Sequence, residues 1–229
     1  MMLSAAELEI IRLSLKVALT AVLFSLPLGV GAAWLLARHR FPGRDLVSGL
    51  IHLPLVLPPV VTGYVLLSMF GRSGLIGAWL EPLGLVFAFD WTGAALAAGI
   101  MGFPLMVRSV RLAFDMADPG LEQAAATLGA SPLQRFLTVT FPLALPGVIA
   151  GAVLAFAKAL GEFGATITFV SSIPGETRTL PLAIYSLTQV PGGEAAALRL
   201  VLISAGVSIL ALVVSEVMVR RATGAGGRT

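Results

Sequence analysis

Long apolar runs dominate this sequence and limit the folds that it can adopt. They cover roughly residues 17–37, 50–70, 93–110, 143–157 and 195–219, and a membrane-spanning helix needs about 20 apolar residues. Of all residues 57% are hydrophobic and only 12% are charged, whereas a soluble domain carries about 25% charged residues. The sequence therefore predicts an all-α integral membrane protein with about five transmembrane helices.

The composition argues against several classes of function. There is no cysteine for a disulfide or a thiolate, and the two histidines, His39 and His52, are too isolated for a His-rich metal site. The apolar runs hold no paired carboxylates and no HExxH motif, which argues against a membrane-embedded enzyme. No GxxxxGK[ST] phosphate loop occurs, so we expect no ATP hydrolysis by this chain. The net charge of +3 comes from basic residues at the ends of apolar runs, which indicates membrane orientation rather than nucleic-acid binding.

The second apolar run is interrupted by Pro54, Pro58 and Pro59. Backbone freed by proline inside a membrane needs partners from other helices or from a water-filled cavity. Two interpretations remain open: a broken helix that lines a transport pathway, or a kink near the membrane face. In the first, Pro58 and Thr62 are candidate pathway residues.

The fourth run is interrupted by Lys158 and Glu162, which are four residues apart and can share a helix face. A charge at membrane depth costs roughly 2.5–3.5 kcal/mol on insertion scales and usually faces protein or water. The pair either lies beside the route of an anion or is a structural pair that neutralises itself. Thr166, in the apolar stretch 165–170 that follows, is a further pathway candidate.

Residues 1–221 are predicted to form one transmembrane domain, followed by a disordered Gly-rich tail over 222–229. Residues 75–91 carry four aromatic side chains and are expected at the membrane interface. The run 180–187 is too short to cross and is expected to be interfacial or re-entrant.

Residues 118–146 form the longest stretch without a spanning run. Asp118 can cap the N-terminus of a helix, and Pro119 fits the first position of that helix. Glu122 places a negative charge near the positive end of the helix dipole. Gly129 suits a left-handed C-terminal residue. Ser131-Pro132 predicts the start of a second helix, and Phe141-Pro142 its end. This helix–glycine–helix loop is either a docking element for another protein or a simple connection between spans.

Basic residues predict the orientation of the chain. The loops between the first and second and between the third and fourth spans, with the tail, carry far more arginine than the other two loops, which hold only Arg72 and Arg178. The positive-inside rule places the first group in the cytoplasm, with the N-terminus outside and the C-terminus inside. Arg12 and Lys16, before the first run, argue weakly against this.

The loop resembles a known motif. Gln123-Ala124-Ala125, Gly129 and Val139-Thr-Phe-Pro142 are similar to the EAA loop of ABC importer permeases, in which the loop is a coupling helix that fits a groove on the ATP-binding subunit. The resemblance implies a cytoplasmic coupling loop over 118–142. It assigns contact with that subunit to Glu122, Gln123, Ala124, Ala125, Gly129 and Arg135. Gln123 stands where the family usually has Glu, which puts in doubt the ion pair that this Glu makes.

Further stretches resemble one branch of that family, the permease subunits of molybdate importers. These are Leu53-Pro-Leu-Val-Leu-Pro-Pro-Val-Val61, Phe103-Pro-Leu-Met-Val-Arg108, Gly161-Glu-Phe-Gly-Ala-Thr-Ile-Thr-Phe169 and Ile173-Pro-Gly-Glu-Thr-Arg-Thr179. The resemblance covers roughly residues 11–221 and implies a type I importer permease fold like that of methionine importers, in a bacterial inner membrane. It implies a second copy of the chain, two ATP-binding cassette subunits and a periplasmic molybdate-binding protein as partners. It implies no cofactor on this chain, since ATP and magnesium are used by the ATP-binding subunit.

Other functions stay open at this level. A permease for tungstate or sulfate resembles one for molybdate, because all three are tetrahedral divalent oxyanions. A secondary transporter or channel without an ATPase partner is the main alternative from another class, and it leaves the Ala-rich loop unexplained.

Overall fold

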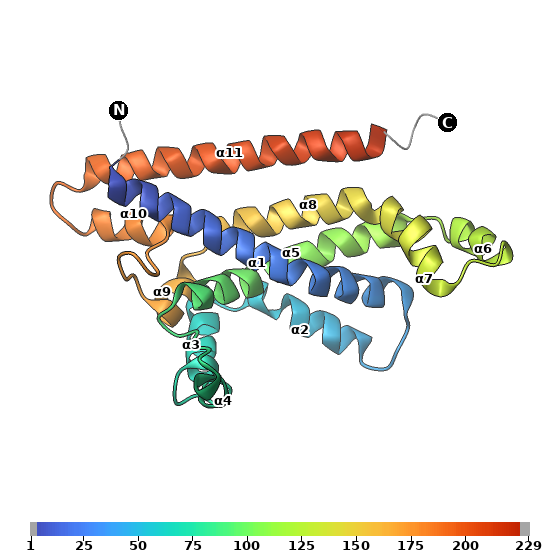
Figure 1. Ribbon diagram of the computed structural model, residues 1–229, viewed down its shortest axis with the longest axis horizontal. Helices are drawn as coiled ribbons and strands as arrows, with labels where there is room; N and C mark the ends of the chain where they lie inside the picture. Colours follow the sequence, from blue (N-terminus) through green and yellow to red (C-terminus); the bar gives the residue numbers. More distant parts are fainter. Residues whose placement is uncertain (1–3, 225–229) are drawn as a thin grey trace.

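The computed structural model describes residues 4–224, and within this range the chain is helical and contains no strand. Figure 1 shows the arrangement. In chain order the elements are α1 (Ala5–Arg38), α2 (Arg44–Val56), α3 (Pro59–Phe70), α4 (Gly77–Leu80), the 3-10 turn η1 (Glu81–Leu83), α5 (Trp91–Met116), α6 (Pro119–Thr127), α7 (Pro132–Arg135), the π-helical turn η2 (Phe136–Thr140), α8 (Phe141–Leu160), α9 (Gly164–Val170), α10 (Leu180–Thr188) and α11 (Glu194–Gly224).

The expected number of spans is confirmed. Four stretches of the described chain are each long and apolar enough to cross a membrane: α1, α5, the continuous stretch Pro132–Leu160 and the part of α11 over Glu194–Val214. α2 and α3 meet the same test only as a pair, and their axes differ by 112° at the break between them. Counting this pair as one broken span gives five. Of the two interpretations of the second run, the break supports the broken helix over a simple kink.

α5 lies in the middle of the bundle and packs against α1 and α8 (Figure 1). Small residues allow its backbone to approach α8. A Cβ added at Gly102 would lie 3.1 Å from the carbonyl oxygen of Ala155, and the Ser109 hydroxyl donates a hydrogen bond of 3.1 Å to the carbonyl of Gly147. Packing of this kind drives helix association in lipid, where burial of apolar side chains gives little advantage.

Polar contacts fix the end of the bundle at which α1 begins. Ser4 and Glu7 form a capping box, which explains why α1 starts before the apolar run itself. Glu7 also accepts a hydrogen bond of 3.0 Å from Arg199 of α11. The Ser14 hydroxyl accepts a hydrogen bond of 2.7 Å from the backbone N–H of Leu180, at the start of α10. These contacts hold α10 and α11 against α1.

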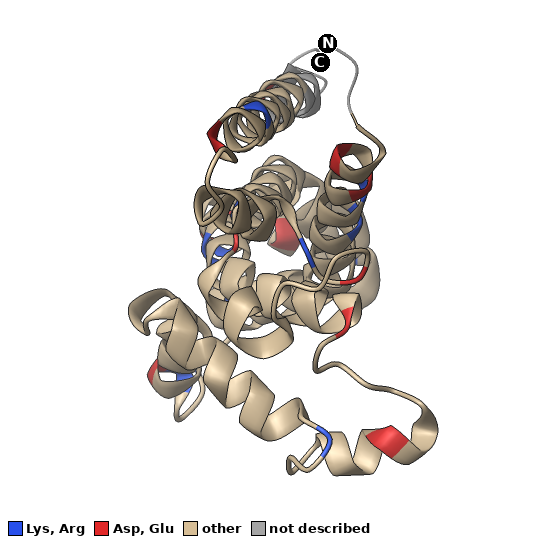
Figure 2. Ribbon diagram, turned by 90° about the vertical axis from the view of Figure 1, so that its left-hand side faces the viewer, with Lys and Arg blue, Asp and Glu red and all other residues tan. Residues whose placement is uncertain are grey.

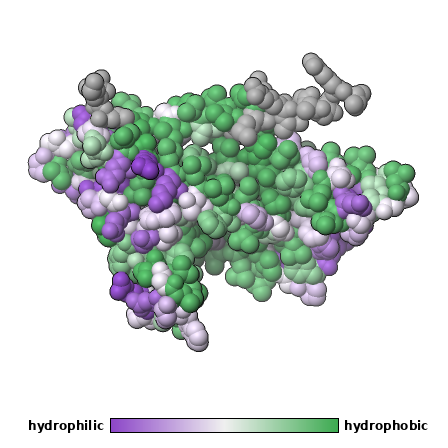
Figure 3. Space-filling view, in the orientation of Figure 1, coloured by the Kyte–Doolittle hydropathy of each residue, from purple (hydrophilic) through white to green (hydrophobic). Residues whose placement is uncertain are grey.

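The long helices place the two kinds of loop at opposite ends. α6 and α7 lie at one end, α10 at the other, and α11 runs from the α10 end toward the α6 end (Figure 1). The ribbon is mostly uncharged (Figure 2). On the face shown in Figure 3, hydrophobic residues cover the middle and hydrophilic ones gather toward the two ends. This is the surface that a membrane-spanning bundle needs.

One boundary prediction is wrong. Phe141-Pro142 does not end the second loop helix, because η2 leads directly into α8. A proline inside an α-helix clashes with the carbonyl four residues earlier. Here the backbone N–H of Phe141 bonds to the carbonyl of Phe136, five residues back. This wider π turn gives Pro142 room at the first turn of α8 and makes α7, η2 and α8 one continuous stretch.

The end of the chain also differs from expectation. α11 extends to Gly224 and so enters the stretch 222–229 that the composition marks as a disordered tail. Residues 225–229 lie outside the described part of the chain.

Candidate functional site

The loop helix α6 forms as its sequence predicts. Asp118 caps it by accepting a hydrogen bond of 2.8 Å from the backbone N–H of Gly120, and Pro119 occupies its first turn. Gly129 follows the helix with φ of +85°, the left-handed conformation that glycine adopts without strain. Ser131 and Gln134 form a capping box that starts α7. The helix–glycine–helix prediction for the first part of the loop is therefore confirmed.

One side of this loop is apolar and uncovered. We call it the docking face and define it by exposed side chains of α6, α7 and the turn between them. Its members are Leu121, Ala124, Leu128, Gly129 and Leu133. Leu128 is 87% exposed and lies outside the candidate spans. Large exposed apolar side chains in such a place mark a protein-interaction surface. Ala125 is half-buried beside this face.

A pocket of about 430 Å³ adjoins the docking face at the base of α6. It opens between the end of α5 and the start of α8 and reaches Leu121 of α6. Met116 and Leu143 supply apolar walls. The apolar surface available to a partner thus extends beyond α6 itself.

Glu122 points away from the docking face and ties α6 to the bundle. Its Oε1 accepts a hydrogen bond of 2.7 Å from the guanidinium of Arg38, the last residue of α1. The same oxygen accepts a hydrogen bond of 2.9 Å from the hydroxyl of Thr140. The same guanidinium donates 3.4 Å to the carbonyl of Ala117. One carboxylate oxygen therefore joins α1, α6 and η2, which makes Glu122 an anchor within this chain. Its contact with an ATP-binding subunit stays a prediction. Gln123 is exposed, and its contact with an ATP-binding subunit stays a prediction.

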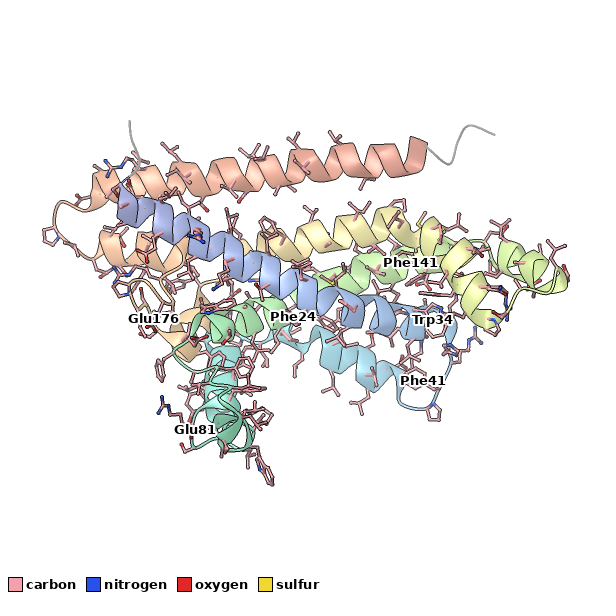
Figure 4. The ribbon with its side chains drawn as sticks, in the orientation of Figure 1. Phe24, Trp34, Phe41, Glu81, Phe141 and Glu176 are labelled. Atoms are coloured by element: carbon pink, nitrogen blue, oxygen red, sulfur yellow. The ribbon has the colours of Figure 1, made fainter. Side chains whose placement is uncertain are left out.

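Aromatic rings support the same anchor. Phe136 packs edge-on against Trp34 at 5.7 Å between centroids and lies near Phe114 and Phe141. Figure 4 shows Trp34 and Phe141 at the end of the bundle that carries α6 and α7. Arg135, predicted as a coupling residue, is half-buried beside this cluster, and its Nε has no hydrogen-bond partner within residues 4–224.

Sequence reasoning missed Arg38 and Thr140 as members of this site. In the sequence, Arg38 is one of the arginines between the first and second spans that predict the orientation of the chain. Its place at the cytoplasmic end of a span gave a usable signal. Few acidic residues lie on that side of the membrane, so an ion pair of Arg38 with Glu122 was one of a small number of possibilities. Thr140 gave no signal of its own, because its place depends on the unexpected π turn.

Three of the candidate pathway residues, Pro58, Thr62 and Thr166, lie in or beside two elements that pack together. α3 lies against α9, and an added Cβ at Gly63 would lie 2.5 Å from the carbonyl oxygen of Ala165. Pro58 is the residue before α3, and Thr62 is buried with no hydrogen-bond partner for its hydroxyl among the described residues. Thr166 is buried in α9 and donates to a backbone carbonyl of the preceding turn. Their role in a pathway stays a prediction.

Lys158 and Glu162 form a close ion pair. The distance between Nζ and Oε2 is 2.6 Å, and the side chain of Glu162 is only 1% exposed, against 31% for Lys158. The other oxygen of Glu162 accepts 2.9 Å from the backbone N–H of Ala165 and so caps the start of α9. The two charges neutralise each other, as the structural interpretation expects. A role of Lys158 toward an anion stays a prediction.

Within residues 4–224, histidine and acidic side chains form no group of three that could hold a metal ion. The described chain has exposed apolar side chains on the loop with α6 and α7, and a break between α2 and α3 whose second helix packs against α9.

Gly129→Val is expected to impair coupling without a steric clash. A Cβ at this position meets nothing within 4 Å, but a β-branched residue in the left-handed conformation costs about 1–2 kcal/mol. Since the resemblance to the EAA loop implies coupling to an ATP-binding subunit, the expected result is a fall of about tenfold in ATP-driven uptake. Gly129→Asn is the matched control, since Asn tolerates this conformation. Uptake by Gly129→Val at the wild-type rate would remove Gly129 from the coupling residues.

Residues 10–224 match the sequence profile described as "Binding-protein-dependent transport system inner membrane component". Among curated proteins, the chain is 56% identical to the molybdenum transport system permease protein ModB of Escherichia coli K12, over the full length of both. It is 55% identical to ModB of Haemophilus influenzae over 94% of each chain. It is 36% identical to the sulfate transport system permease protein CysT of E. coli, over 87% of this chain and 72% of that protein.

Solved structures share the fold at low sequence identity. The chain aligns with a bacterial ABC transporter involved in the import of alginate with a TM-score of 0.75 and 18% identity, over 96% of this chain and 80% of that chain. It aligns with an inward-facing MetNI methionine ABC transporter with a TM-score of 0.73 and 18% identity, over 96% and 99% of the two chains. The predicted fold, a type I ABC importer permease, is confirmed. The chain belongs to the family of binding-protein-dependent transport system inner membrane components.

Proposed function

We propose that this chain is the transmembrane subunit of an ATP-driven molybdate importer. The observation that carries the proposal is the 56% identity, over the whole of both chains, to a protein described as a molybdenum transport permease. Identity to a sulfate permease is lower, at 36%. The substrate class is thus a tetrahedral divalent oxyanion, with molybdate favoured over sulfate, and tungstate as the analogue of similar size and charge.

The proposed assembly contains two copies of the chain, two ATP-binding subunits and a periplasmic binding protein. The docking face supports the presence of the ATP-binding subunits, because an exposed apolar surface outside the spans is typical of a site that another protein covers. The chain itself binds no cofactor in this proposal, and ATP and magnesium are used by the ATP-binding subunit. Five spans per chain are few to enclose a route, which favours a symmetric dimer with the pathway between its copies.

The proposed mechanism follows from how α6 is held. ATP binding moves the partner's surface, and with it the docking face. Glu122 passes this movement to α1 through Arg38 and to η2 through Thr140. Because η2 continues into α8, and α8 packs on α5, the central helices move with it. Alternating access then results from tilting of helices around the pathway rather than from chemistry on this chain.

Uptake of labelled molybdate into proteoliposomes tests the proposal. The chain is reconstituted with its ATP-binding subunit and its binding protein, and excess tungstate or sulfate is added as a competitor. We expect uptake that requires ATP and is blocked by tungstate but not by sulfate. Blocking by sulfate would move the chain to the sulfate permeases. Equal uptake without ATP or the partner would identify a secondary transporter or channel instead.

A further inference from the structure

Two basic residues near the start of α1 depart from the charge distribution of the rest of the chain. Arg12 and Lys16 are exposed, one helical turn apart, at the end predicted to face outward. Neither forms an ion pair with a carboxylate within residues 4–224. Glu9 lies one turn earlier, and its carboxylate is near Gly175: a Cβ added at Gly175 would lie 3.4 Å from Oε1 of Glu9. The two positive charges therefore remain available to a ligand.

Lys16 lies at the mouth of a large groove. Its ammonium stands 3.4 Å from the centroid of the Trp91 ring, and Trp91 forms part of the groove wall. Tryptophan is enriched at the level of lipid headgroups, and lysine beside it keeps its charge at the membrane surface. This contact places Lys16 beside the Trp91 end of the groove, and Arg12 lies one helical turn closer to the N-terminus.

The groove has a volume of about 910 Å³ and is lined almost entirely by apolar side chains. Its walls are α1, the second half of α2, the first half of α5 and the loop before α5. Phe24, which is 76% exposed, stands on the α1 side, and Figure 4 shows it on the edge of α1 that faces α2. The remaining wall includes Leu28, Pro54 and Phe103. A groove of this kind within the spans excludes water and suits a hydrocarbon chain.

We propose that this groove binds an anionic phospholipid. One acyl chain lies along the apolar walls from Trp91 toward Phe103, and the phosphate of the headgroup lies between Arg12 and Lys16. Charge complementarity selects an anionic lipid over a zwitterionic one, since each basic side chain near an anionic surface strengthens binding by on the order of fivefold. The proposal concerns a ligand other than the transported anion and does not depend on the proposed function.

Native mass spectrometry of the detergent-extracted chain tests the headgroup part. Phosphatidylglycerol and phosphatidylcholine with the same acyl chains are the two probes. We expect Arg12→Gln/Lys16→Gln to weaken phosphatidylglycerol binding about thirtyfold and to leave phosphatidylcholine binding unchanged. Arg40→Gln/Arg108→Gln removes two other exposed arginines and serves as the matched control. Equal phosphatidylglycerol affinity of the first variant and the wild type would overturn the proposal.

A single cysteine tests the groove itself, because the chain has none. Phe24→Cys is labelled with a fluorophore in liposomes, and lipids with brominated acyl chains are added as quenchers. We expect stronger quenching by brominated phosphatidylglycerol than by brominated phosphatidylcholine, and equal quenching by both at Leu202→Cys on the exposed surface of α11. Equal quenching at Phe24→Cys would contradict the proposal. Efficient cross-linking of Phe24→Cys between two copies would also overturn it, since a second copy would then cover the groove.

Discussion

Lys158→Met is expected to lower the stability of the protein and to abolish transport. The side chain of Glu162 is almost fully buried, and Lys158 provides its counter-charge at 2.6 Å. Removing one partner of a buried pair leaves an uncompensated charge and costs roughly 3–5 kcal/mol. We expect the unfolding temperature in detergent to fall by about 10 °C. An unchanged unfolding temperature would show that Glu162 needs no counter-charge.

The double variant Lys158→Met/Glu162→Gln separates the two interpretations of this pair. Glutamine keeps an oxygen that accepts from the backbone N–H of Ala165, so the cap of α9 is retained. We therefore expect the double variant to recover most of the lost stability. If it also recovers ATP-driven uptake, the pair is structural. If it is stable but does not transport, the positive charge of Lys158 serves the passage of the anion.

The parts of the fold that sequence predicts well have a local physical cause. The apolar runs require spanning helices, because lipid offers no partner for unpaired backbone groups. The boundaries of α6 follow from Asp118 and Gly129, whose side chain and backbone act within a few residues. The proline-rich second run breaks for an equally local reason, since Pro58 and Pro59 lack the N–H groups that a continuous helix uses.

The parts that sequence does not predict depend on distant contacts. Phe141-Pro142 has the local pattern of a helix end, yet η2 admits the proline and the helix continues. The partner of Glu122 is 84 positions away in sequence, and no local pattern identifies it. Likewise the pairing of α3 with α9 is visible only when Gly63 meets Ala165 in space. The helix–glycine–helix loop was thus predictable as an element, whereas its connection to the spans was not.

Glu122→Gln is expected to uncouple ATP hydrolysis from uptake. Its carboxylate faces Arg38 and Thr140 rather than the docking face, so assembly with the ATP-binding subunit should persist. Glutamine can still accept from Arg38 and Thr140 but lacks the negative charge. A hydrogen bond between two charged groups contributes more than one with a neutral acceptor, within about 1.5–3 kcal/mol, so the tie between α6 and α1 weakens. We expect the ratio of molybdate taken up to ATP hydrolysed in proteoliposomes to fall about tenfold, while hydrolysis continues.

Two further variants make this prediction specific to the anchor. Arg38→Gln removes the contact with α1 but keeps the bond from Thr140 to Glu122, so it should give at most the same loss. Arg38→Gln/Glu122→Gln should be no worse than Glu122→Gln alone, because both substitutions act on one shared contact. Glu81→Gln is the matched control, since its pair with Arg72 is exposed, spans 3.6 Å and lies away from the coupling loop. Additive losses in the double variant, or a wild-type ratio in Glu122→Gln, would show that movement of α6 reaches the spans by another route. The other route is along the backbone, from α7 through η2 into α8. The hydrogen bond from the N–H of Phe141 to the carbonyl of Phe136 in this segment does not involve Glu122.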